Sequence, residues 1–155
     1  MSEEEYLDQG VTGEGFLLEV DGVEIGRFVE VEGLQVTIDV VTVAEGGQNG
    51  FVHKFPGRMT WPDLVFKRGL TKSDSLLDWI NKVAGDGFAG AGNKVTRNTA
   101  AVTVLDAAGN RLRSWEVEGA FPVQWSGPRF SVDNGGLPEE QLVVTHHGFK
   151  ASTKG

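Results

Sequence analysis

Two short turn sequences constrain the fold of this chain more than any other feature. Asp21 and Gly22 separate apolar runs at 16–20 and 23–31, and residues 106–110 lie between two further apolar runs. An Asp-Gly pair suits the type I′ turn of a two-residue hairpin, because both central residues of that turn need a positive φ. We therefore expect at least two antiparallel β-hairpins.

Three other regions also have strand character. Residues 34–40 alternate apolar and polar side chains, which predicts a strand with one buried and one polar face. Residues 59–66 return to β character, and Pro62 indicates an edge strand or a bulge there. Segments 121–125 and 141–147 complete a set of six or seven predicted strands.

One helix is predicted, over residues 76–83. Its apolar residues recur at helical spacing, and Thr71 or Ser73 can cap its N-terminus. Many short strands and one helix predict a mainly β (α+β) fold, a small antiparallel β-barrel or sandwich with the helix on its flank.

The chain is expected to form a single domain. We predict a flexible acidic arm over 1–15, the domain over 16–150 with a glycine-rich loop at 85–98, and a disordered tail over 151–155. The absence of cysteine excludes disulfides and thiolate metal sites. The acidic N-terminus differs from a signal peptide, and no apolar run reaches membrane-helix length. We therefore expect cytoplasmic synthesis and assembly without a membrane anchor.

The charge is unevenly distributed along the chain. Residues 1–45 hold 12 acidic side chains and one basic, Arg27, which leaves 10 acidic and 13 basic side chains in residues 46–155. One interpretation is a solvated acidic face and arm. The other is a pair of complementary surfaces that meet when identical subunits associate head to tail. Either interpretation disfavours nucleic-acid binding through a basic surface.

No catalytic, cofactor or metal site is predicted. The sequence 85–90 matches G-x-G-x-x-G, but it follows a helix and precedes no helical pattern, so a loop is the better interpretation. His146 and His147 are adjacent and would point to opposite faces of a strand. No serine lies in a G-x-S-x-G elbow. These patterns favour a non-enzymatic protein.

The four tryptophans allow two interpretations. Trp79 falls on the predicted helix, where a core position is expected. Trp61 and Trp125 fall near strand edges, where subunit interfaces compete with the core, because tryptophan is enriched in interface cores.

Residues 20–58, VDGVEIGRFVEVEGLQVTIDVVTVAEGGQNGFVHKFPGR, resemble the phage tail-tube family of contractile-tailed phages and extracellular contractile injection systems. LVFKRGLTKSDSLLDWI (64–80) is similar to that family's strand leading into its helix, and VTVLDAAGNRLRSWEVEGAFPVQWSGP (102–128) to its later hairpin. PEEQLVVTHHG (138–148) is similar to its closing strand. The collinear resemblance extends over 16–149.

The resemblance implies a structural subunit whose hexameric rings stack into an inner tube, with a fold similar to the type VI secretion tube protein. It also implies partners: further copies of the chain, a contractile sheath protein, baseplate or tube-initiator and terminator proteins, and effector protein or phage DNA in the lumen. The final location would be a phage tail or a contractile injection particle.

Two alternatives remain open from the sequence. One is a tube-initiator or baseplate-proximal subunit of the same family. The other, from a different class, is a monomeric β-barrel that binds a small ligand, which the size and the tryptophans permit.

A candidate interface between subunits follows from the tube hypothesis. Residues 45–54 would order against the next ring, with Phe51 and Val52 buried and with Lys54 or Arg58 near acids of residues 1–45. The full predicted set is Glu45, Gly46, Gly47, Gln48, Asn49, Gly50, Phe51, Val52, His53, Lys54, Arg58, Trp61 and Trp125.

Overall fold

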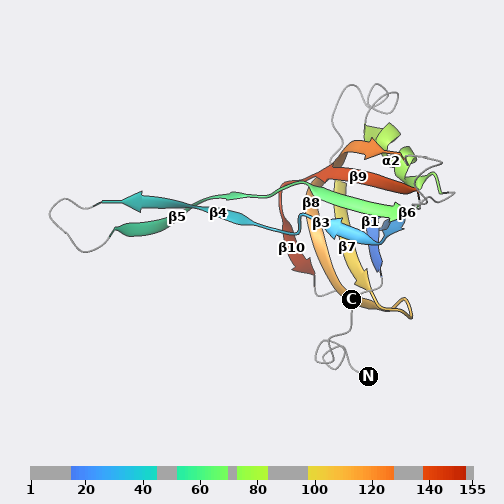
Figure 1. Cartoon of the computed structure of the whole chain (residues 1–155), viewed down its shortest axis with the longest axis horizontal. Coiled ribbons are helices and arrows are strands. Elements are labelled where there is room, and N and C mark those ends of the chain that lie inside the picture. The colour runs from blue at the N-terminus through green and yellow to red at the C-terminus, as the bar shows by residue number, and fades with distance from the viewer. Residues whose placement is uncertain (1–14, 45–51, 70–72, 84–97, 128–137, 153–155) are drawn as a thin grey trace, which may run out of the picture.

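The computed structural model describes residues 15–44, 52–69, 73–83, 98–127 and 138–152. These residues form a curved antiparallel sheet, a helix packed against it, and a two-stranded hairpin that projects far from the rest (Figure 1). The predicted mainly β fold with one helix is confirmed for this part of the chain. No helix among the described residues is long and apolar enough to span a bilayer.

The described part contains ten strands and one helix. The strands are β1 (Gly15–Val20), β2 (Val23–Phe28), β3 (Glu30–Glu32), β4 (Thr37–Val43), β5 (His53–Thr60), β6 (Leu64–Gly69), β7 (Asn98–Leu105), β8 (Arg111–Ser126), β9 (Glu139–Thr145) and β10 (Phe149–Ser152), and the helix is α2 (Ser75–Val83). The predicted number of six or seven strands is too low. The expected strand over 59–66 is divided between β5 and β6, the expected strand over 23–31 is divided between β2 and the short β3, and β10 is not expected from the sequence.

Both predicted hairpins are confirmed. At the β1–β2 turn, Asp21 has a φ of 51° and Gly22 a φ of 81°, as a type I′ turn requires. At the β7–β8 turn, the N–H of Asn110 donates to Asp106 Oδ1 at 2.7 Å, and Gly109 has a φ of 83°. The two turn sequences therefore fix four of the strands.

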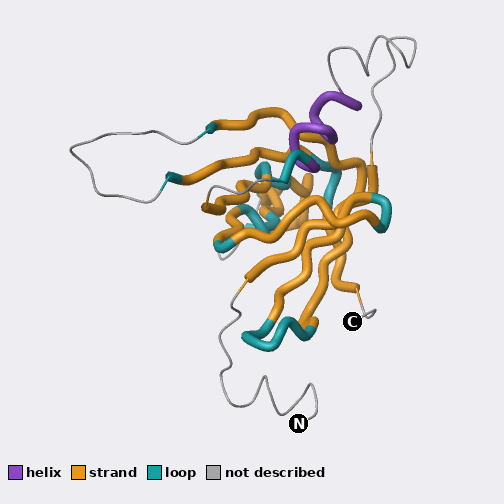
Figure 2. Tube along the Cα trace, turned by 90° about the vertical axis from the view of Figure 1, so that its right-hand side faces the viewer, coloured by secondary structure: helices purple, strands orange, loops and turns teal. Residues whose placement is uncertain are grey.

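The main sheet has the strand order β2-β1-β7-β8-β9-β6-β3, and β10 pairs with β8 beside this path. Its two end strands, β2 and β3, follow each other in the chain. Between them the N–H of Val29 donates to the carbonyl of Lys67 on β6 at 2.9 Å. The sheet therefore curls back on itself as a small barrel, with α2 across one end (Figure 2).

The core lies inside this barrel and beneath α2. The rings of Phe28 and Phe66 lie 5.1 Å apart between centroids, and both side chains are fully buried. From the helix, Leu76, Trp79 and Val83 face this core, which confirms the core position predicted for Trp79. The barrel thus has a hydrophobic core formed within one chain.

A buried ion pair ties β6 to β9. Arg68 Nε lies 2.8 Å from Glu140 Oε2, and the two side chains are only 4% and 11% exposed. The Arg68 guanidinium also lies 5.1 Å from the centre of the Phe28 ring. A Cβ at position 26 would collide with that guanidinium, so Gly26 provides the space for it.

Two sequence predictions are wrong in detail. Residues 33–36 are not in a strand, and β4 at 37–43 is exposed on every residue, so the expected buried face of the 34–40 strand does not exist. The expected strand over 59–66 is two strands, β5 and β6, interrupted at 61–63 around Pro62. At the C-terminal end, β10 covers Phe149–Ser152, and the predicted domain bounds stay a prediction.

The buried ion pair generates a stability prediction. Glu140→Ala should lower the free energy of unfolding by about 3–5 kcal/mol, because it leaves the Arg68 charge buried without a partner. Urea unfolding of the monomer, followed by tryptophan fluorescence, measures this. Glu30→Ala removes an exposed partner of Lys67 and should cost less than about 1 kcal/mol. Equal losses for the two variants would contradict the prediction.

Candidate assembly interface

The projecting hairpin is formed by β4 and β5, which pair with each other and with no other described strand. It extends away from the barrel as a long arm (Figure 1). Every residue of β4 is exposed, and on β5 only His53 is partly covered. The hairpin therefore has no core of its own within the described chain.

Apolar side chains are concentrated on this arm. Of the 13 large apolar residues that are exposed in the described part of the chain, eight lie between positions 36 and 59. They are Val36, Ile38, Val40, Val41, Val43, Val52, Phe55 and Met59, each between 41% and 62% exposed. Such a concentration of exposed apolar side chains is typical of an interaction surface.

The strand register places apolar side chains on both faces of the hairpin. Val41 pairs with Phe55 on one face, and the next pair, Val40 with Pro56, lies on the opposite face. Ile38 shares the face of Val40, because the extra residue of the bulge between Ile38 and Val40 lies in β5. We call these face A (Val41, Val43, Phe55) and face B (Ile38, Val40, Pro56).

A hairpin with apolar side chains on both faces is unusual for an antiparallel pair of strands. Such a pair normally covers the core with one face and leaves a polar face in water. An isolated two-stranded hairpin is marginally stable at best. Among the described residues nothing covers either apolar face of the hairpin, which makes both faces candidate contact surfaces.

The predicted interface residues are distributed unevenly in the structure. Residues 45–51 lie outside the described part of the chain. Val52, His53, Lys54 and Arg58 lie together on or beside β5, and all but His53 are exposed. Their role as an interface stays a prediction.

The two predicted interface tryptophans lie elsewhere. The Trp61 ring packs edge-on against Phe149 of its own chain, at 4.9 Å between centroids. Trp125 is 37% exposed on β8, in a segment that pairs with β9. The predicted interface set does not include the apolar residues of β4, because the alternation at 34–40 is typical of a half-buried strand. It also omits Phe55 and Met59 of β5. The run of β-branched residues VVTV at 40–43 is the available signal that both faces are apolar.

Several acids of the first 45 residues have partners within the chain. Arg111 Nη2 lies 2.6 Å from Glu19 Oε1, and Lys67 Nζ lies 3.9 Å from Glu30 Oε2 and 3.6 Å from Glu32 Oε1. Arg27 Nε lies 3.7 Å from Glu24 Oε1. These pairs offset part of the acidic charge locally, so the surface is less one-sided than the sequence count.

A second exposed feature is the outer edge of β10, which pairs only with β8 among the described strands. Lys150 on β10 lies 3.2 Å from Glu118 and 3.8 Å from Glu116 on β8. Its hydrogen bond to Glu118, helped by the charges of Glu116 and Glu118, raises the pKa of Lys150 above its usual value. A lysine on an edge strand is a common protection against uncontrolled strand pairing.

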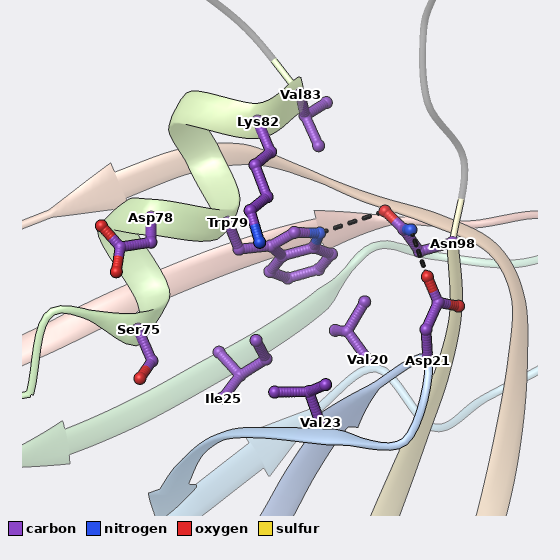
Figure 3. Close-up of a pocket in the computed structure, with 10 residues that line it drawn as sticks. All are labelled: Val20, Asp21, Val23, Ile25, Ser75, Asp78, Trp79, Lys82, Val83 and Asn98. Carbon is purple, nitrogen blue, oxygen red and sulfur yellow. Dashed lines mark hydrogen bonds between the residues drawn. The ribbon is translucent and has the colours of Figure 1, made fainter. Parts of the chain in front are cut away.

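A pocket of about 480 Å³ lies between α2 and the β1–β2 turn (Figure 3). Trp79 Nε1 donates to Asn98 Oδ1 at 3.2 Å, and Asn98 Nδ2 donates to Asp21 Oδ2 at 2.6 Å, so these polar groups serve one another. Among the described residues no buried side-chain polar atom lacks a partner, and no three histidines or acids cluster as metal ligands. No ligand class follows from the residues that line this pocket.

Comparison with known proteins gives one family and a consistent set of folds. The family model described as T4-like virus tail tube protein gp19 matches residues 14–150. A chain of the sheath–tube complex of an extracellular contractile injection system, PVC, in the extended state is 20% identical, with a TM-score of 0.75 and 98% of each chain covered.

Two further solved structures share the fold. A chain of the anti-feeding prophage cap, described as the tube terminating cap, is 21% identical with a TM-score of 0.73, covering 92% of this chain and 91% of that one. A chain of the PVC sheath/tube terminator is 22% identical with a TM-score of 0.71, covering 89% and 93%. No curated protein sequence matches significantly.

The exposure of the hairpin generates a prediction about hydrogen exchange. In the free subunit, backbone amides of β4 and β5 should be protected at least roughly a hundredfold less than those of β7 and β8, because no core holds the hairpin closed. Exchange followed by mass spectrometry on dilute monomer measures this, with the β7–β8 hairpin as internal control. Equal protection of the two hairpins would contradict it.

Proposed function

The chain belongs to the T4-like virus tail tube protein family, and we propose that its copies join into a tube through the two apolar faces of the β4–β5 hairpin. Tail tube proteins are structural, and the predicted family and the predicted tube-subunit function are confirmed by the match over residues 14–150. The proposal adds which surface makes the contacts, and that the rings are hexameric and stacked.

One observation carries the proposal: the hairpin exposes apolar residues on both faces while the barrel is complete without it. Val41 is 48% and Phe55 52% exposed on face A, and Val40 is 62% and Ile38 49% exposed on face B. A subunit of a homopolymer always has further copies of itself at hand. Those copies are therefore the partner that can cover the hairpin in every position of the tube except at its ends.

The geometry of the arm suits contacts between rings. The arm projects well beyond its own barrel (Figure 1). It can therefore contact a second copy whose barrel lies too far away to touch the first barrel. Lys54 and Arg58 are exposed on the arm, and acids such as Asp39 and Asp63 are exposed on or near it. Basic groups of one copy would meet acids of residues 1–45 of another, which fixes the register of the contact.

Contacts within a ring would use a strand edge. Among the described strands β10 pairs with β8 alone, and pairing its other edge with a neighbouring copy would cover an edge that otherwise promotes aggregation. Closed rings of identical subunits leave no edge exposed. In this arrangement the edge of β10 makes the contacts within a ring, and the hairpin makes the contacts between rings.

Partners beyond the tube itself follow by analogy. The similar chains come from a sheath–tube complex, a tube terminating cap and a sheath/tube terminator. We infer that this tube also lies within a contractile sheath, between a baseplate or initiator and a terminator, in a particle assembled in the cytoplasm. Its lumen would carry effector protein or phage DNA, and the subunit itself would have no catalytic role.

Two double variants test the hairpin. Val41→Ser/Phe55→Ser alters face A, and Ile38→Ser/Val40→Ser alters face B. Each removes apolar surface that assembly would bury, so each should raise the critical concentration for tube formation on the order of tenfold or more. Stability of the monomer should change by less than about 1 kcal/mol, because these side chains are exposed in it. Sedimentation and negative-stain microscopy measure assembly, and urea unfolding measures stability.

Val23→Ser/Val29→Ser is the matched control, since it removes two valines that are 64% and 70% exposed on the barrel. It should assemble at nearly the wild-type concentration. If it weakens assembly as much as the face A and face B variants do, the hairpin has no special role. If only one face matters, the hairpin is covered on one side and the two-faced proposal is wrong.

A further inference from the structure

The hairpin root determines how the arm is held. We define the root as the two connectors between arm and barrel, residues 33–36 and 61–63, neither of which is in a strand. Because β4 and β5 pair with no barrel strand among the described residues, contacts at the root are what can fix the direction of the arm.

Trp61 is the largest side chain at the root, and it is wedged against the segment between β9 and β10. Its ring meets Phe149 edge-on, with centroids 4.9 Å apart and planes at 67°. A Cβ at position 148 would lie only 3.0 Å from Trp61 Cε2 and 3.1 Å from Cζ2. Gly148 also has a φ of 125°. Both the space and the backbone at this position therefore require glycine.

Pro62, the residue after Trp61, is held by the buried side chain of His146. The backbone N–H of Gly148 donates to His146 Nδ1 at 3.0 Å, so that nitrogen accepts and the ring proton is on Nε2. His146 Nε2 then donates to the carbonyl of Pro62 at 2.9 Å. His146 is only 8% exposed, so this bond has little competition from water. The outgoing connector is thereby attached to the 146–148 turn.

That turn is itself attached to the long strand β8. The N–H of His147 donates to the carbonyl of Glu118 at 2.8 Å, and the N–H of Glu118 donates to the carbonyl of Gly148 at 2.9 Å. The incoming connector is held from the other side: Gly33, with a φ of 98°, packs directly on the backbone of Asp63 and Leu64. The connector 33–36 thus packs on the connector 61–63 and on β6, and the connector 61–63 is bonded to the 146–148 turn.

We propose that Trp61, seated against Gly148 and fixed through the His146–Pro62 bond, is a positioning residue that sets the direction of the β4–β5 arm in the free subunit before assembly. The inference rests on the proposed function, because direction matters only if the arm binds other copies. An arm already aimed at its binding site loses less conformational freedom on assembly than one that swings freely. Loosening the wedge therefore weakens assembly without touching face A or face B.

The direction of the arm can be measured in the monomer. The chain has no cysteine, so a Thr42→Cys/Asn81→Cys pair places two spin labels at exposed positions, one on the arm and one on α2. Double electron–electron resonance below the critical concentration should give a narrow distance distribution for the otherwise wild-type chain. Gly148→Ala should broaden it and, without the labels, raise the critical concentration for assembly roughly tenfold.

Matched variants separate positioning from general destabilisation. Gly22→Ala imposes a similar backbone strain at a φ of 81° where a Cβ would meet nothing within 4 Å, so it should keep the narrow distribution and normal assembly. Trp61→Ala removes a half-buried ring outside the barrel core and should broaden the distribution. Trp61→Phe keeps a ring against Phe149 and should give a distribution narrower than that of Trp61→Ala.

The outcomes decide the two proposals separately. If the wild-type chain forms no tubes, the proposed function fails, while the distance distributions still test the wedge. If the wild type assembles but Trp61→Ala and Gly148→Ala keep its distance distribution, the wedge is refuted and the hairpin interface stands. If Gly148→Ala does not fold, the distance distribution of Trp61→Ala tests the wedge alone, because the core residues inside the barrel do not include Trp61.

Discussion

Burial of apolar surface divides this protein into a barrel that covers its own hydrophobic core and a hairpin whose apolar side chains stay exposed. Inside the barrel, Phe28 and Phe66 pack together under the helix residues Leu76 and Trp79, and the sheet closes where Val29 bonds to Lys67. On the hairpin, equally apolar residues have no such cover. The same driving force that folds the barrel in one chain is thus left available on the hairpin for contacts between chains.

The root joins these two parts and explains several unusual residues together. Gly33 and Gly148 have positive φ values and lie against backbone or ring atoms, and His146 uses both ring nitrogens for backbone groups. These residues lie in the connectors and in the turn between β9 and β10, outside the strands of the barrel. A single role accounts for all of them: they support an arm whose orientation has to be reproducible from one subunit to the next.

The sequence predicts the local structure well where turn chemistry is explicit and poorly where burial depends on partners. Asp21-Gly22 and the 106–110 turn identify two hairpins, and helical spacing identifies α2, because these signals are local. The alternation at 34–40 indicates a half-buried strand, since a pattern cannot tell cover by the same chain from cover by another copy. Of the candidate site, Lys54 and Arg58 lie on the arm, whereas the role of Gly148 depends on contacts with Trp61 that are distant in sequence.

The two bare faces of the hairpin also bear on how such a subunit can be stored. A cell that accumulated this chain as free monomer would hold a high concentration of exposed apolar hairpins. Non-specific aggregation would then compete with ordered assembly. Growth from a template that incorporates each subunit soon after synthesis keeps the concentration of free monomer low. On the proposed interface, the exposed apolar faces that would hold the polymer together also favour seeded elongation at the tube end over spontaneous condensation.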